Sequence, residues 1–189
     1  MDIYKKTISF IIPTVGRSTL SRTVRSIEKA EDDKILVIRD DPPHNDWGSF
    51  ARNTGMEQAI CDYLAFIDDD DWYVQGHRDI MERAMQENTK NYPIFFRMQF
   101  PSGRILWKDK KFKNGNVGTP MILVPNDREK LRSRWNGTTY AEFHFINEWG
   151  WSYKDIIWRD EVIVNLGHND EKYESGLTFQ ERRKLKIYK

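Results

Sequence analysis

The sequence has one cysteine, no long apolar run and almost no net charge, and each absence excludes a class of protein. Cys61 is alone in 189 residues, so neither an internal disulfide nor a zinc cluster of several cysteines can form. The longest apolar stretches are pieces such as Tyr63–Ile67, far below the ~18 residues that a membrane span needs. The 30 basic residues balance 29 acidic ones, so nucleic acid is not expected as a partner. Residues 1–12 lack the features of a signal peptide, and we expect a compact cytoplasmic protein.

The first ninety residues alternate short apolar runs with amphipathic segments. Buried strands are predicted at three β-branched or aromatic runs, Thr7–Ile12, Lys34–Ile38 and Tyr63–Ile67. Helices are predicted after each run: one capped by Ser18, one over residues 47–60, and one containing Ile80, Met81, Ala84 and Met85. This alternation of strands and helices is typical of an open, mainly parallel α/β sheet.

The second half is less regular, and we expect it to pack on the same sheet. The predicted elements are a hairpin of Pro93–Phe100 and Arg104–Trp107, a strand at Thr119–Val124, a short helix from Asn126 or Asp127 to about Trp135, a helix over about Tyr140–Trp149, and a strand at Val162–Leu166. A basic tail follows at residues 176–189.

Four aspartates, Asp68–Asp71, follow the third predicted strand directly. In open α/β sheets, ligands bind at the carboxyl ends of the strands. Adjacent carboxylates repel one another, and a hard divalent ion such as Mg²⁺ or Mn²⁺ would relieve that repulsion. In an extended segment Asp68 and Asp70 would point the same way. The alternative is a solvated acidic turn in which Asp71 caps the next helix.

Four segments in this order resemble the nucleotide-sugar half of a GT-A glycosyltransferase. They are ISFIIPTVGRSTLSRTVRSI, VIRDD, ARNTG and YLAFIDDDDWY, within roughly residues 7–75, and they are most similar to glycosyltransferase family 2 and its small stand-alone bacterial and viral relatives. The resemblance implies a GT-A-type, Rossmann-like open sheet flanked by helices, with a small antiparallel addition in the second half. It also implies a single domain over residues 1–189, with a nucleotide-sugar half to about residue 100 and an acceptor and catalytic half over about 101–175.

The resemblance also implies which residues face the donor. The residues that would lie against the nucleotide, its ribose or its diphosphate are Pro13, Thr14, Arg17, Asp40 with Asp41 in reserve, Arg52 and Asp68. Within the acidic cluster, Asp70 would bind the metal, and Asp69 would replace it if the register is shifted by one residue.

Sugar transfer with inversion needs a carboxylate near the acceptor hydroxyl. Relatives carry an acid in a segment resembling G-D-Y-x-F-I, which AEFHFI at residues 141–146 matches with Glu142 in place of Asp. Glu142 is therefore the expected base, with Glu148 and Asp160 as substitutes and a surface glutamate as the alternative. A helix here would place Phe143 on a buried side.

Two later segments complete the expected site. By resemblance, His168 would complete the metal coordination or hold the diphosphate, although a histidine in a turn is the alternative. Gly118 and Thr119 would lie nearest the donor sugar and the acceptor, because glycines allow a ligand to approach the backbone closely. His77, just past the acidic cluster, is a weaker metal candidate.

These features together favour a metal-dependent, inverting glycosyltransferase. It would move a sugar from a nucleotide-diphosphate sugar, most readily a UDP-sugar, to a hydroxyl of a glycan or another acceptor, with Mn²⁺ or Mg²⁺ as cofactor. Two alternatives stay open. One is a nucleotidyltransferase on a similar sheet, although the loop PTVGRST has one glycine where such enzymes have a glycine-rich loop. The other is a non-catalytic module that binds a nucleotide or a glycan.

Overall fold

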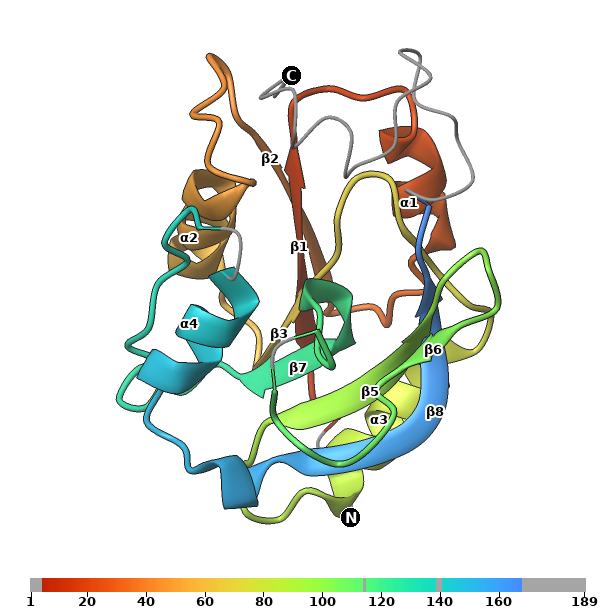
Figure 1. Cartoon of the computed structure of the whole chain (residues 1–189), viewed down its shortest axis with the longest axis vertical. Helices are drawn as coiled ribbons and strands as arrows, with labels where there is room; N and C mark the ends of the chain where they lie inside the picture. The colour runs from red at the N-terminus through yellow and green to blue at the C-terminus, as the bar shows by residue number, and fades with distance from the viewer. Residues whose placement is uncertain (1–4, 114, 139–140, 168–189) are drawn as a thin grey trace.

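A computed structural model describes residues 5–113, 115–138 and 141–167, and the strands of this part form one open sheet flanked by helices (Figure 1). The strands are β1 (Ile8–Thr14), β2 (Lys34–Arg39), β3 (Tyr63–Phe66), β4 (Trp72–Tyr73), β5 (Ile94–Gln99), β6 (Ile105–Leu106), β7 (Ile122–Pro125) and β8 (Ile157–Asn165). The helices are α1 (Leu20–Ser26), α2 (Ser49–Gln58), α3 (His77–Glu87) and α4 (Ala141–Glu148), with 3₁₀ turns η1 (Thr119–Met121) and η2 (Tyr153–Asp155). None of these helices is long and apolar enough to cross a membrane.

The strand order is β2-β1-β3-β7-β5-β8-β4, with β6 paired to β5. β1 pairs in parallel with both β2 and β3, and each antiparallel pairing includes at least one of the strands β5 to β8. The parallel pairing places the carboxyl ends of β1, β2 and β3 at one edge of the sheet. This arrangement confirms the predicted α/β class and the antiparallel addition in the second half.

Alternation along the central strands builds a core on each face of the sheet. On β1, Phe10 and Ile12 face the core that α3 covers, whereas Ile11 faces the core shared with α2 and α4. Figure 1 shows α2 and α4 together on one side of the sheet and α1 and α3 on the other. Because both faces are covered, the carboxyl edge of the parallel strands is left as the place for a site.

Four sequence predictions need correction. The strand at Lys34–Ile38, expected to be buried, is β2 at the edge of the sheet, and all its residues are exposed or half-buried. The helix expected from Asn126 or Asp127 to Trp135 is a single turn, because the Asp127 carboxylate accepts the backbone N–H groups of Glu129 and Lys130, and the Lys130 carbonyl accepts the N–H of Gly150. Residues 119–121 form η1 before β7 begins. Helix α1 begins at Leu20, and no side chain caps it.

Candidate active site

The carboxyl ends of the three parallel strands bring the predicted donor-binding residues to one edge. Thr14 ends β1 and is 5 % exposed, and Pro13 beside it is buried. Asp40 follows β2, and its backbone N–H donates to the Thr14 carbonyl at 2.9 Å. Asp68–Asp71 follow β3 in the same direction. Loops that are far apart in the sequence therefore meet here, as the topology requires.

Asp69 and Asp71 are the two buried members of the acidic cluster, and Asp69 contacts β1. Asp69 is 3 % exposed, and its carboxylate accepts hydrogen bonds from the Thr14 hydroxyl and from Nη1 of Arg17. The same Arg17 nitrogen lies 2.9 Å from Oδ2 of Asp70, whose side chain is 18 % exposed. Asp69 thus ties the cluster to β1, while Asp70 is half-buried beside Arg17.

The other three aspartates are arranged to share a cation. One carboxylate oxygen from each of Asp68, Asp70 and Asp71 lies within 4.8 Å of the others. Burial raises the pKa of Asp70 to about 6, helped by the negative charges of Asp68, Asp71 and Asp69 and opposed by Arg17. Three converging carboxylates that disfavour one another's charge form the all-oxygen donor set that Mg²⁺ and Mn²⁺ prefer, so these residues fit such an ion.

Arg52 of α2 is buried next to this cluster, and its guanidinium forms an ion pair with Asp68. It is 4 % exposed, donates through Nη2 to the Asp68 carboxylate, and donates through Nη1 to the Trp47 carbonyl at 2.7 Å. Its guanidinium carbon lies 4.9 Å from the centre of the Trp135 ring. The Asn53 side-chain amide bonds both the N–H and the carbonyl of Trp135, at 2.9 Å each. Sequence reasoning missed Trp135 and Asn53, although Asn53 stands inside the ARNTG segment.

Glu142, the predicted base, lies in the first turn of α4 and is held by Thr119. Thr119 is 3 % exposed, and its hydroxyl donates to Oε1 of Glu142 at 2.9 Å. In the antiparallel pairing of β3 with β7, Ala65 lies opposite Leu123, so η1 lies at the sheet edge where β3 runs into the aspartates. Thr119 therefore anchors a carboxylate of the second half at the edge that carries the acidic cluster.

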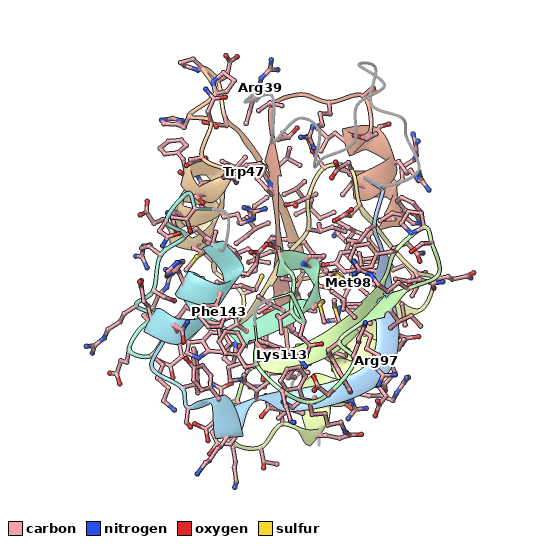
Figure 2. The ribbon with its side chains drawn as sticks, in the orientation of Figure 1. Arg39, Trp47, Arg97, Met98, Lys113 and Phe143 are labelled. Carbon is pink, nitrogen blue, oxygen red and sulfur yellow. The ribbon has the colours of Figure 1, made fainter. Side chains whose placement is uncertain are left out.

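Two predicted donor residues at the end of β2 have partners of their own. The Asp40 carboxylate accepts the backbone N–H of His44 and pairs with its ring, which stacks on Phe50 with ring centres 3.9 Å apart. Asp41 points outward and lies 3.5 Å from Arg39. Figure 2 shows Arg39 at the same end of the molecule as Trp47.

The remaining candidates lie in varied surroundings. A Cβ at Gly118 would approach Met98 to 2.7 Å, so this glycine makes room for a side chain of the protein. Glu148 is exposed near the end of α4, and Asp160 of β8 pairs with Arg97 and Lys110. His77 is completely buried. His168 lies outside the described residues.

Phe143, expected on a buried side of α4, is half-buried. Its ring stacks on Phe112 with centres 4.7 Å apart, and Phe112 stacks in turn on Tyr153. Figure 2 shows Phe143 on α4, facing the loop that carries Lys113. The contact between Phe143 and Phe112 joins this loop to the first turn of α4, next to Glu142.

Residues 42–148 match the family model described as glycosyl transferase family 2. The chain belongs to glycosyl transferase family 2. The match runs from the loop after β2 to the last residue of α4, so it includes Arg52, the acidic cluster and Glu142. Family membership confirms the class of enzyme predicted from the sequence, a glycosyltransferase. No curated protein matches the chain.

Solved structures confirm the GT-A-type fold. TarS of S. aureus superposes with a TM-score of 0.64 at 11% identity, over 90% of this chain and 38% of TarS. The TarS 1-349 complex with UDP-GlcNAc gives 0.62 at 10% identity, over 92% of this chain and 61% of that one. A197 from STIV gives 0.50 at 18% identity, over 82% of each chain. This chain thus spans less than two thirds of TarS.

Proposed function

We propose that this member of family 2 transfers a sugar from a nucleotide-diphosphate sugar to a hydroxyl of a glycan or another acceptor, with inversion at the anomeric carbon. The observation that carries the proposal is the hydrogen bond from Thr119 to Glu142, because it holds a carboxylate at the edge of the sheet where the acidic cluster lies. A UDP-sugar is the first candidate donor, supported by the TarS structures obtained with UDP and with UDP-GlcNAc.

The residues at the strand ends would divide the donor between them. Thr14 and Asp40 would border the nucleotide, and Arg52 would orient Asp68 toward the ribose. Arg17 would face the diphosphate, since its guanidinium already lies at the outward side of the cluster. Asp69 would keep the loop after β3 in place rather than contact the donor.

A divalent cation fits the carboxylates of Asp70, Asp71 and Asp68. By the family resemblance alone, His168, outside the described residues, would be a further ligand. When bound, Mn²⁺ or Mg²⁺ would supply positive charge where the departing diphosphate gains negative charge. The protein's part is to fix the carboxylates: Asp71 accepts the Gly167 N–H at 3.0 Å, and Asp69 anchors its neighbours to β1.

Glu142 would act as the general base. Its carboxylate would accept the proton of the acceptor hydroxyl while that oxygen attacks the anomeric carbon and the diphosphate leaves from the opposite face. The hydrogen bond from Thr119 to Oε1 fixes the orientation of the carboxylate. A base fixed in this way is ready to accept the proton as soon as the acceptor is in place.

Incubation with a panel of UDP- and GDP-sugars and Mn²⁺, followed by measurement of released nucleoside diphosphate, tests the proposal. We expect slow release from at least one UDP-sugar, abolished by EDTA. Release of nucleoside diphosphate only from a GDP-sugar would mean that the donor is a GDP-sugar and not a UDP-sugar. Pyrophosphate release from a nucleoside triphosphate and a sugar phosphate would indicate a nucleotidyltransferase, and binding without turnover would indicate a non-catalytic module. Cytoplasmic location and the division into donor and acceptor halves stay predictions.

A further inference from the structure

Arg17 occupies an unusual position among the charged residues of the site. One nitrogen, Nη1, lies 2.9 Å from Oδ1 of Asp69 and 2.9 Å from Oδ2 of Asp70. Its side chain is 46 % exposed, whereas the two aspartates are 5 % and 18 % exposed. Arg17 follows Gly16, whose φ of 92° lies in the left-handed region, in an exposed loop between β1 and α1. The guanidinium is thus held by two carboxylates, while nearly half of the side-chain surface stays exposed.

The second guanidinium of the cluster, Arg52, is held in a different way. Its side chain is 5 % exposed and is fixed by the Trp47 carbonyl and the face of Trp135 as well as by Asp68. Four carboxylates against two guanidiniums leave a formal charge of −2 among these six side chains, which one divalent cation would balance. Because the Arg17 side chain is far more exposed than that of Arg52, Arg17 is the positive charge better placed to exchange partners.

We propose that Arg17 and a divalent cation compete for Asp70, and that a nucleotide diphosphate relieves the competition by drawing the guanidinium onto its phosphates. The inference rests on the proposed function. A cation at Asp70 would lie within a few ångströms of the Arg17 charge, and two positive charges at that distance repel strongly in a partly buried site. Phosphate oxygens offer Arg17 an equivalent charge-assisted partner. Asp69 keeps its hydrogen bond from Thr14 when Arg17 leaves, so the loop after β3 is not released.

This competition makes Arg17 a positioning residue that couples the two ligands. If the diphosphate removes Arg17 from Asp70, it raises the affinity for the cation, and by linkage the cation raises the affinity for the nucleotide by the same factor. Replacing Arg17 with glutamine keeps a hydrogen-bond donor and removes the charge. Such a variant should bind the cation more tightly on its own and should lose most of the coupling.

The test measures Mn²⁺ binding by electron paramagnetic resonance, with and without UDP, for the parent, Arg17→Gln, Arg17→Lys and Asp70→Asn. Arg25→Gln, an exposed cation in the last turn of α1, is the matched charge control. We expect Arg17→Gln to bind Mn²⁺ alone at least about fivefold more tightly than the parent, and the enhancement by UDP to fall by a similar factor. Arg17→Lys should resemble the parent, as should Arg25→Gln.

Equal or weaker Mn²⁺ binding by Arg17→Gln, with parental circular dichroism, would overturn the competition while leaving the metal site intact. An equal gain in Arg25→Gln would show a general charge effect and would also overturn it. If the parent binds no Mn²⁺ at millimolar concentration and Asp70→Asn behaves identically, the metal dependence in the proposed function fails, and this inference fails with it.

Discussion

At the scale of single residues, four consecutive aspartates have four different surroundings. Asp69 is buried against Thr14, Asp68 pairs with Arg52, Asp70 lies half-buried beside Arg17, and Asp71 accepts the Gly167 N–H. The sequence predicted that Asp68 and Asp70 would share a side if the segment were extended. The segment is instead a turn, closed by the hydrogen bond from the Asp71 N–H to the Asp68 carbonyl at 3.1 Å, so Asp71 converges with Asp68 and Asp70. The sequence left Asp69 and Asp70 both open as the metal ligand, since the partners that distinguish them lie more than fifty residues away in β1 and its loop.

We predict that Glu142→Gln retains UDP binding and loses transfer. The amide keeps the size of the side chain but cannot accept the acceptor's proton, and removal of a general base typically costs ~10²–10⁴ in rate. The loss should appear in kcat, with the Kd for UDP within about twofold of the parent. Calorimetry beside a transfer assay measures both. Transfer within a few-fold of the parent would make another residue the base, with Glu148 and Asp160 next to be tested.

Thr119 provides the matched control for this prediction. Thr119→Val removes the hydroxyl at nearly constant volume and should lower kcat, because the Glu142 carboxylate loses its hydrogen bond. Thr119→Ser keeps the hydroxyl and should restore most of the rate. Equal losses in both variants would indicate a packing role for Thr119 rather than control of the base.

At the scale of elements, α2 approaches β1 closely because residue 55 is glycine. A Cβ at Gly55 would lie 2.5 Å from Cγ2 of Ile11, a fully buried side chain. Gly55→Ala should therefore destabilise the fold by about 1–3 kcal/mol despite the better helix propensity of alanine. Urea unfolding measures the change, with Thr54→Ala on the same helix as a control. Ile11→Ala should reduce the cost of Gly55→Ala in a double-mutant cycle; additive losses would contradict the steric account.

Most elements could be predicted from local patterns, and the exceptions have a common cause. The three β-branched or aromatic runs became β1, β2 and β3: β1 and β3 are buried throughout, whereas β2 is the half-exposed strand at the edge of the sheet. Helices α3 and α4 follow their apolar spacing. Residues 127–135 were also expected to form a helix, but long-range hydrogen bonds hold their backbone in an irregular conformation. The Asn53 side chain bonds the backbone N–H and carbonyl of Trp135, and the Lys130 carbonyl accepts the N–H of Gly150. Such partners cannot be read from a local window.

At the scale of the whole molecule, His77 makes stability depend on pH. It is completely buried, stacks on Tyr73 with ring centres 4.4 Å apart, and donates from Nδ1 to the Val74 carbonyl at 2.9 Å. Burial lowers its pKa from the usual 6.5, so the folded state holds it neutral.

Below pH 6.5 the unfolded chain binds a proton at His77, whereas His77 of the folded chain stays neutral until a lower pH. The contribution of His77 to stability is therefore complete above this pH and is lost as the pH falls toward the lowered pKa of the folded state, by at most about 1.4 kcal/mol per pH unit. Urea unfolding of the parent and of His77→Gln between pH 5 and 8 measures this contribution to the free energy of unfolding. A parent and variant with the same pH slope would contradict this account.

The central claim is that the carboxyl edge of the sheet binds a nucleotide diphosphate through a metal at Asp70. Calorimetry of UDP binding to the parent and to Asp70→Asn, each in Mn²⁺ and in EDTA, tests it most directly. Asp69→Asn is the comparison. Its main effect should be a loss of folding stability rather than of the response to Mn²⁺, because it disturbs the buried hydrogen bond from Thr14. We expect Mn²⁺ to tighten UDP binding to the parent by about tenfold or more, equivalent to ~1.4 kcal/mol, and to leave Asp70→Asn unchanged. Equal UDP affinity of the parent in Mn²⁺ and in EDTA, or an Asp70→Asn variant that responds to Mn²⁺ like the parent, would contradict it.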